Sequence, residues 1–241
     1  MEYRFTGIML RKREVGETDR FYTFFTREQG KVTAIAKGVR KGEAKLASSL
    51  ETATLAEIMV ARTRGTGKIT GAVLEQSYPA LHRSFGFLRD VTRFFADVDH
   101  LIEPEERDES IFELLKRYLD ALEVIAAEPV DDRNAWLLTE GAYYQLFVLL
   151  GYQLELGMCV VSRERLRSGG VFRVSFSMGG VVSSDHFRDV PDAQPISENA
   201  IKTLRLIAHQ PLQHLAKIIV DDAVASEIVR LRSSYQRFIR D

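Results

Sequence analysis

The chain has 241 residues, of which 45% are hydrophobic and 28% charged, and its formal net charge is −1. This composition is ordinary for globular domains and excludes a disordered or collagen-like chain. The single cysteine excludes a disulfide framework and a metal site built from several cysteines. No apolar run reaches the roughly 18 residues that span a bilayer, and the charged N-terminus lacks the apolar core of a signal peptide, so the expected location is the cytoplasm.

The small net charge hides an uneven distribution along the chain. Residues 1–81 carry 14 Lys and Arg against 9 Asp and Glu, a balance of +5, so the other 160 residues sum to −6. Residues 97–132 hold 13 acidic residues and only three basic ones. This split predicts a polyanion-binding face on the N-terminal part alone. Chance segregation of charge on solvated surfaces explains the same numbers, and composition does not separate the two.

The first 80 residues are predicted to form strands. Short runs rich in β-branched and aromatic residues alternate there with glycine-containing breaks. The runs are Phe5–Arg13, Arg20–Thr26, Lys31–Lys37, Thr52–Arg62 and Lys68–Ser77. Short strands separated by such turn signals predict a small closed or partly closed barrel.

The pattern changes at Tyr78-Pro79, after which apolar residues recur at helical spacing. One apolar stripe runs from Phe87 to Ile102, and a second runs from Ile111 to Ile125. The segment 134–150 is apolar on most sides, which predicts a buried central helix. The N-terminal part is therefore followed by a helical body.

The last third of the chain adds two helices and an excursion. Ser197 followed by Glu198 predicts a capped helix start, and the helix reaches residue 208. Apolar residues recur at helical spacing between Val224 and Phe238, which predicts a C-terminal helix with these residues on its inner face. Residues 169–187 are rich in Gly and Ser and alternate in polarity, which predicts a hairpin. The predicted fold class is α+β, with a strand domain over about residues 1–80 and a helical domain over about 81–241.

Catalytic signatures fail when they are tested. Residues 64–68 resemble a phosphate loop, but Arg62 and Ile69 stand where that motif needs Gly and Ser or Thr. Ser183–His186 hold the residue types of a catalytic triad, but consecutive residues do not form one, and no strand–Gly-x-Ser-x-Gly–helix context surrounds them. The sequence predicts a protein that is not an enzyme and needs no cofactor, with a hydrolase centred on Ser183–His186 as the remote alternative.

Cations beside aromatic rings on the predicted strands point to nucleic acid. Strand periodicity puts Lys31 and Lys37 on one face of their strand. It puts Arg20, Tyr22 and Phe24 together on one face of the strand before. Cations follow phosphates and rings stack on unpaired bases, which is the chemistry of single-strand binding, although the rings would equally fill a barrel core beside solvated lysines. Together with the loop 38–45, the predicted DNA-binding residues are Arg11, Arg13, Arg20, Tyr22, Phe24, Lys31, Lys37, Arg40, Lys41 and Lys45.

Several short motifs occur in a fixed order over most of the chain. The first are Gly7-Ile8-Met9-Leu10-Arg11, Gly16-Glu17-Thr18-Asp19-Arg20, Phe25-Thr26-Arg27-Glu28-Gln29-Gly30-Lys31, Ala36-Lys37-Gly38-Val39-Arg40, Lys45-Leu46 and Leu50-Glu51. Later ones are Leu149-Leu150-Gly151-Tyr152, Cys159 and Gly179-Gly180-Val181-Val182. In order and spacing they resemble the RecO family of bacterial recombinational repair proteins.

The resemblance implies an N-terminal OB-fold, a helical body and a zinc-ribbon-like excursion at about residues 155–190. It implies a mediator that binds single- and double-stranded DNA, anneals complementary strands and helps RecA load onto DNA coated by single-strand-binding protein. The implied partners are RecR and the acidic C-terminal tail of single-strand-binding protein, and the implied location is the nucleoid. The second hypothesis is an assembly adaptor whose acidic helical body docks proteins while the barrel makes only weak, non-specific DNA contact.

One departure from the family concerns zinc. Many members carry Cys-x-x-Cys after the Gly-Tyr segment and again after the Gly-Gly hairpin, but here the four positions are Cys159, Ser162, Ser183 and His186. Serine hydroxyls are poor ligands for zinc, so a member without zinc is expected. The hairpin is then expected to be held by the packing of apolar residues such as Val171, Phe172, Val174 and Phe176.

The implied acidic tail, which ends in Phe, needs an apolar pocket rimmed by cations. Lys202 and Arg205 lie three residues apart on one predicted helix, beside Leu204 and Ile207. Helical spacing puts both charges on one face, and they are the predicted partner-binding residues. The alternative is a pair of solvated cations on an amphipathic helix. The acidic stretch 97–132 is expected to repel DNA and leave it on the barrel.

Overall fold

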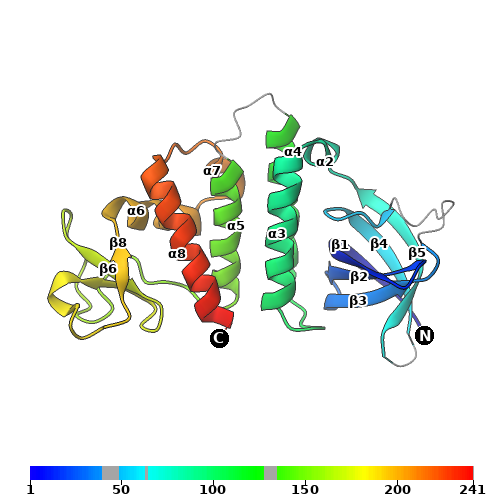
Figure 1. Cartoon of the computed structure of the whole chain (residues 1–241), viewed down its shortest axis with the longest axis horizontal. Coiled ribbons are helices and arrows are strands. Elements are labelled where there is room, and N and C mark those ends of the chain that lie inside the picture. Colours follow the sequence, from blue (N-terminus) through cyan, green and yellow to red (C-terminus); the bar gives the residue numbers. More distant parts are fainter. Residues whose placement is uncertain (40–48, 63–64, 128–134, 241) are drawn as a thin grey trace. The chain divides into compact units, whose positions relative to one another are not determined.

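The structure is a computed structural model that describes residues 1–39, 49–62, 65–127 and 135–240. Two compact units make up the chain, Met1–Val130 and Asp131–Asp241 (Figure 1). The N-terminal unit extends beyond the predicted domain boundary at residue 80, and its described residues include the helices α2, α3 and α4. Among the described residues, no helix combines the length and the apolar character needed to cross a membrane.

Strands close the N-terminal unit into a barrel in the order β1-β2-β3-β5-β4, with β4 pairing back to β1. All neighbouring pairs are antiparallel except β3 with β5. This OB-like barrel and the α+β class are confirmed (Figure 1). The strands are β1 (Glu2–Val15), β2 (Asp19–Thr26), β3 (Gly30–Ala36), β4 (Leu55–Ala61) and β5 (Gly67–Gln76).

The barrel core is built from alternate residues of each strand. On β3, Val32, Ala34 and Ala36 are buried, whereas Lys31 and Thr33 lie on the outer side. The predicted alternation of this strand, which separates Lys31 from the buried residues, is therefore confirmed. Burial of each large apolar side chain contributes about 1.5–3 kcal/mol, so the interior set fixes the register of the strands. That set includes Phe5, Met9, Tyr22, Phe24, Leu50, Ile58, Val60 and Ile69.

Helices α2 (Pro79–Arg83), α3 (Phe85–Leu101) and α4 (Glu109–Ala127) complete the N-terminal unit. All buried residues of α3 belong to the first predicted stripe, and α4 buries most of the second stripe together with Phe112 and Ala121. Phe94 and Tyr118 join the two helices through an edge-on ring contact of 4.9 Å. Both helices also contact β1, so they cover part of the outer barrel surface.

Gly30 marks where the connection between α3 and α4 runs along the barrel. The backbone N–H of Glu105 donates to the carbonyl oxygen of Lys31 at 2.9 Å. Gly30 has a positive φ of 66°, and a Cβ there would lie 1.9 Å from the carbonyl oxygen of Glu106. A side chain at this position is excluded by both backbone conformation and space.

The C-terminal unit is built around α5 (Ala135–Leu149), which contacts α6 (Glu198–His209), α7 (Leu212–Leu215) and α8 (Asp222–Arg240). The predicted buried central helix is confirmed, because α5 is buried on most of its sides. The predicted cap is also confirmed, since the Ser197 hydroxyl accepts from the N–H of Ala200 at 3.1 Å.

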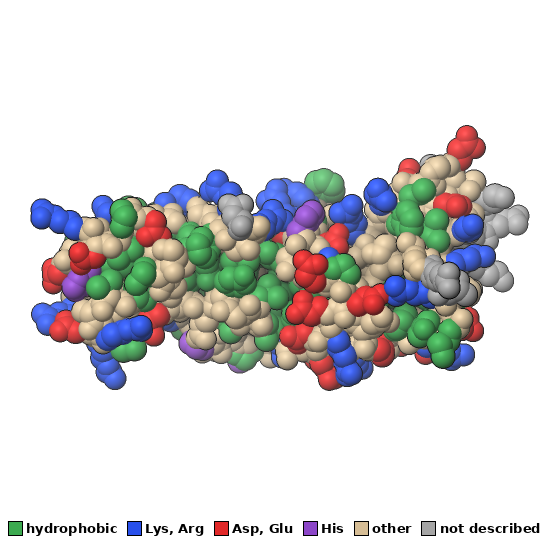
Figure 2. All heavy atoms as spheres, turned by 90° about the horizontal axis from the view of Figure 1, so that it is seen from below, with side chains coloured by type: hydrophobic (Ala, Val, Ile, Leu, Met, Phe, Trp, Pro, Cys, Tyr) green, Lys and Arg blue, Asp and Glu red, His purple; other side chains and the backbone are tan. Residues whose placement is uncertain are grey.

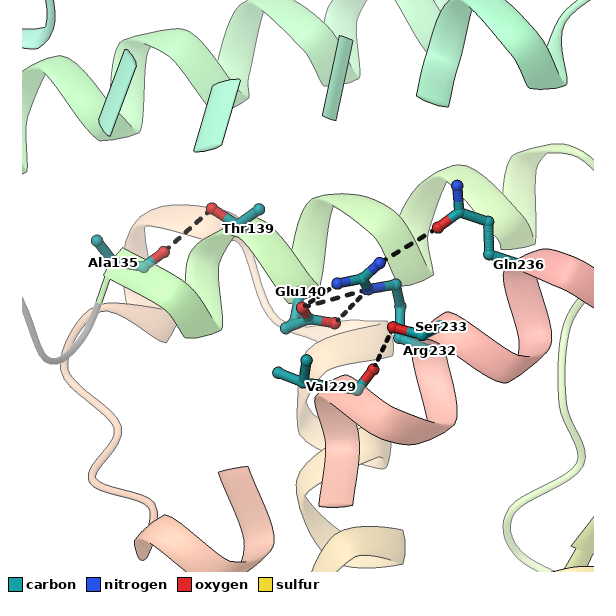
Figure 3. Close-up of polar contacts among 7 residues, drawn as sticks. All are labelled: Ala135, Thr139, Glu140, Val229, Arg232, Ser233 and Gln236. Carbon is teal, nitrogen blue, oxygen red and sulfur yellow. Dashed lines mark hydrogen bonds and ion pairs between the residues drawn. The ribbon is translucent and has the colours of Figure 1, made fainter. Parts of the chain in front are cut away.

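A buried ion pair joins α5 to α8 (Figure 3). Arg232 Nε lies 3.2 Å from Glu140 Oε2, and the two side chains are only 10% and 5% exposed. The guanidinium also donates to Gln236 Oε1 at 3.2 Å and lies 4.4 Å from the centre of the Tyr143 ring. Both charges are therefore paired within the helical core.

The excursion is a sheet of three strands in the order β7-β6-β8. The predicted hairpin is confirmed as β6 (Phe172–Ser175) and β7 (Gly180–Ser183), while β8 (Gln194–Ile196) is an addition. Phe172 and Val174 are buried, as predicted, and Phe176 stacks on Tyr235 at 4.7 Å. The prediction that Val171 packs inside is wrong, since it is 67% exposed.

Candidate nucleic-acid interface

The outer surface of β1, β2 and β3 carries two rows of side chains that cross the strands. One row is Arg11, Thr23 and Thr33, and the next is Arg13, Phe21 and Ile35. Each row joins residues that pair directly across neighbouring strands. We call the surface formed by these six residues the outer β1–β3 face.

A bulge in β1 puts the arginines on this surface. Met9 pairs with Phe24 inside the barrel, and the register then shifts before Arg11 pairs with Thr23. Strict alternation would point Arg11 to the same side as Met9, but the extra residue, Leu10, reverses the alternation. The cations of β1 therefore join the outer faces of β2 and β3.

The outer β1–β3 face is hollowed by a pocket of about 310 Å³. The guanidinium of Arg13 lies 5.4 Å from the centre of the partly exposed Phe21 ring. The hydroxyls of Thr23 and Thr33 lie 3.2 Å apart. A flat ring, a cation and paired hydroxyls in one pocket match the needs of a nucleotide, which offers a base, a phosphate and a sugar. The pocket is lined by Arg11, Arg13, Phe21, Thr23, Thr33, Thr66 and Asp99.

The structure contradicts the predicted placement of two aromatic residues. Tyr22 and Phe24 are 0% and 1% exposed and belong to the barrel core. Burial raises the pKa of the Tyr22 phenol because it disfavours the charged form. Neither ring is available to stack on a base, and Phe21 is the ring that β2 presents outward. Both faces of β2 carry aromatic rings, so the alternation of side chains does not by itself show which rings face outward.

Acidic partners hold several of the predicted cations. Arg11 Nη1 lies 3.3 Å from Asp99 Oδ2, and Lys31 Nζ lies 3.4 Å from Asp99 Oδ1. Arg20 pairs with Glu14 at 3.3 Å. On the face of the molecule shown in Figure 2, basic and acidic side chains are likewise interspersed. The barrel therefore offers paired cations rather than one continuous basic surface on that view.

The remaining predicted DNA-binding residues divide into two groups. Arg13 is exposed on β1, and Lys37 is exposed just after β3 ends. Arg40, Lys41 and Lys45 lie outside the described residues.

The positions at which the family resemblance implies zinc do not fit that metal. Burial raises the pKa of the Cys159 thiol, but hydrogen bonds from Ser183 and Ser162 outweigh it and lower the pKa to about 6. The backbone N–H of Ser183 donates to Cys159 Sγ at 3.4 Å. His186 instead places Nδ1 3.1 Å from a carboxylate oxygen of Asp189. One thiol and two hydroxyls do not make the nitrogen and sulfur set that zinc prefers. Within the described residues, no group of three or more His, Cys, Asp or Glu is placed to hold a metal.

We therefore expect protein purified without added metal to contain well below one zinc per chain. Because hydrogen bonds to Cys159 hold these loops together, a chelator should leave the melting temperature unchanged. Elemental analysis and thermal denaturation with and without chelator measure both quantities. Stoichiometric zinc whose removal lowers the melting temperature would contradict this interpretation.

The two predicted partner-binding residues lie on α6 and have different surroundings. Lys202 is exposed and pairs with Glu198 at 2.8 Å. Arg205 donates from Nε to the carbonyl oxygen of Leu156 at 2.8 Å. Arg205 lines a pocket of about 550 Å³ that also includes Tyr152 and Leu204, whereas Lys202 lies at a smaller neighbouring pocket that shares Arg205. Arg205 thus reaches a pocket whose lining mixes apolar residues with Glu155 and His209, and Lys202 remains beside it.

Comparison with known proteins gives one consistent answer along the chain. The family model described as recombination protein O N terminal matches residues 1–78, and the one described as recombination protein O C terminal matches residues 97–238. The DNA repair protein RecO of Dehalococcoides mccartyi is 27% identical over 99% of this chain and 90% of its own length. Those of Synechococcus sp. (strain JA-2-3B'a(2-13)) and Rubrobacter xylanophilus are 32% and 30% identical, over 87% and 89% of this chain and 74% and 84% of their own lengths. The barrel, the helical unit and these matches together show that the chain belongs to the RecO family of DNA repair proteins.

Proposed function

We propose that this chain is a non-enzymatic mediator of recombinational repair that binds single-stranded DNA on the outer β1–β3 face. The observation that carries the proposal is the Phe21 ring, which lies on the outer surface of β2 beside Arg13. Cations that follow the backbone and a ring that stacks on bases bind single strands regardless of sequence. The outer surface of strands 2 and 3 is also where OB-folds take up oligonucleotides.

Annealing follows from the same chemistry. Two complementary strands repel each other through their phosphates, and Arg and Lys side chains neutralise phosphates and release counterions. The same contacts require no unpaired base, so they extend to double-stranded DNA. Arg40, Lys41 and Lys45 belong to this proposal by their charge, as do Arg11, Arg13 and Lys37.

The relatives' names and the family resemblance support the wider setting. We infer that the chain helps RecA load on DNA coated by single-strand-binding protein, together with RecR, and acts at the nucleoid. The competing function is an assembly adaptor with weak DNA contact. It is favoured by the acids that pair with barrel cations, such as Glu113 with Arg27 at 2.9 Å.

An annealing assay with purified protein and no partners separates these two functions. Labelled complementary oligonucleotides should anneal faster with the protein than without it. Arg11→Ala/Arg13→Ala should slow annealing, because both cations of the outer β1–β3 face are lost, whereas the matched double variant Arg230→Ala/Arg237→Ala, which removes two exposed charges of α8, should not. No acceleration by the unmodified protein would support the adaptor instead.

We further propose that the acidic tail of single-strand-binding protein docks at α6. A tail that ends in Phe requires apolar surface and a cation for its carboxylates, and Arg205 with Leu204 and Tyr152 supplies both in a pocket that Glu155 also lines. Lys202→Ala/Arg205→Ala should weaken binding of a labelled tail peptide about tenfold or more in fluorescence anisotropy, because charge-assisted contacts contribute about 1.5–3 kcal/mol.

The double variant also removes the hydrogen bond from Arg205 to the carbonyl oxygen of Leu156, which supports the pocket. The single variant Lys202→Ala removes a cation and leaves that hydrogen bond in place, because Lys202 pairs only with Glu198 among the ion pairs of the described residues. A double variant that binds the peptide as tightly as the unmodified protein would show that the tail does not dock at α6.

A further inference from the structure

We propose that the Asp99 carboxylate occupies the position of a DNA phosphate between Arg11 and Lys31, and that single-stranded DNA binds there by displacing it. This inference rests on the proposed function and deepens it. It adds a phosphate subsite, with a built-in competitor, to the outer β1–β3 face.

The geometry of the contact is that of an anion held between two cations. Each oxygen of the Asp99 carboxylate faces its own partner, with Arg11 at 3.3 Å and Lys31 at 3.4 Å. Two oxygens on one centre, each beside a separate cation, match the two non-bridging oxygens of a phosphodiester. Arg11 and Lys31 come from β1 and β3, whereas Asp99 comes from α3, so the two cations belong to the barrel and the anion is supplied by a helix beside it.

The place of this contact next to the pocket gives it a role in binding. Asp99 and Arg11 both line the pocket of about 310 Å³ that also contains Phe21 and Thr23. A strand whose phosphate replaced the carboxylate would carry its sugar and base into a space already lined by a ring and a hydroxyl. Asp99 thus closes one side of the pocket that the proposed function uses.

The strength of the contact permits displacement. The side chains of Arg11, Asp99 and Lys31 are 44%, 18% and 12% exposed, so water reaches the Arg11 side of the cluster. Lys31 and Asp99 are mostly buried, whereas the Arg11 end of the Asp99–Arg11 pair is solvated, and an ion pair with a solvated end is weakened by water and screened by salt. A nucleotide can therefore compete with the carboxylate, because its phosphate pairs with the cations and its base stacks on Phe21. An anion without a base gains only the ion pairs.

The test is the affinity of the full chain for labelled oligo(dT), measured by fluorescence anisotropy at low salt. Asp99→Asn keeps the shape of the side chain and removes its charge, and the backbone carbonyl of residue 99 that accepts from Lys31 stays in place. We expect this variant to bind about fivefold to tenfold more tightly. Asp90→Asn is the matched control, because Asp90 lies on the same helix and pairs with Arg89, and it should change the affinity less than about twofold.

A second measurement does not depend on the folding of the Asp99 variant. Because Asp99 already neutralises part of the charge of Arg11, Arg11→Ala should weaken oligo(dT) binding less than Arg13→Ala does. A third measurement uses the Asp99 variant again: in the Arg11→Ala background, Asp99→Asn should lose most of its gain.

The outcomes separate this inference from the proposed function. Asp99→Asn protein that binds no more tightly than the unmodified protein, or an Arg11→Ala loss as large as that of Arg13→Ala, would overturn the Asp99 subsite and leave DNA binding on the face intact. Failure of the unmodified protein to bind oligo(dT) would overturn the proposed function itself.

Discussion

Replacing Arg232 by Met is expected to destabilise the C-terminal unit by about 3–5 kcal/mol. The substitution removes the Arg232 guanidinium from the buried Glu140 carboxylate, and removing one partner of a buried ion pair is strongly unfavourable. The single tryptophan, Trp136, lies on α5 four residues before Glu140. Urea unfolding followed by tryptophan fluorescence therefore reports on the helix that carries this pair.

Two further variants distinguish the ion pair from general damage to the core. Glu140→Leu/Arg232→Met removes both charges and should recover most of the lost free energy of unfolding, because apolar replacements of buried pairs are often tolerated. Lys202→Met breaks the exposed pair with Glu198 and should cost less than about 1 kcal/mol. A loss below about 1 kcal/mol for Arg232→Met would show that the Glu140 charge is not confined to the core.

Phe21→Ala is expected to weaken single-stranded DNA binding about fivefold to 150-fold, because stacking of a base on one aromatic ring contributes about 1–3 kcal/mol. Oligo(dT) titration by fluorescence anisotropy measures this loss. Tyr22→Phe is the matched control, because the ring of Tyr22 is next to Phe21 in the sequence but faces the barrel core. The affinity of this variant for oligo(dT) should be unchanged. Phe21→Trp keeps a stacking surface and should retain binding. If Phe21→Ala protein binds as tightly as the Tyr22→Phe control, the ring is not a stacking surface.

Most helices and strands could be predicted from the sequence, because each of them follows from a local pattern of residues. The runs of β-branched and aromatic residues predicted all five barrel strands, and helical spacing of apolar residues predicted α3, α4 and α8. The segment that is apolar on most sides predicted α5, and the cap at Ser197 predicted α6, whereas the short helices α2 and α7 were not predicted. β8 was not predicted, because it is three residues long and includes Pro195. Its strand geometry depends on pairing with β6 rather than on its own sequence.

The binding face was predicted only in part, because it depends on which side of each strand becomes the interior. Arg11 and Arg13 point outward because of the bulge at Leu10, and no residue type signals that bulge. Rings occur on both faces of β2, so alternation alone chose Tyr22 and Phe24 instead of Phe21. The contact of Asp99 with Arg11 joins residues that are 88 positions apart, and only the packing of α3 beside β1 brings them together.

Photo-crosslinking of a single strand to the unmodified full chain tests the central proposal most directly. An oligonucleotide that carries iodinated pyrimidines crosslinks to aromatic rings that stack on it, and mass spectrometry of the digested complex locates the attachment. The proposal predicts attachment at Phe21, with a lower yield when unlabelled single strand competes. Attachment confined to peptides of the C-terminal unit, with none on β1, β2 or β3, would contradict it.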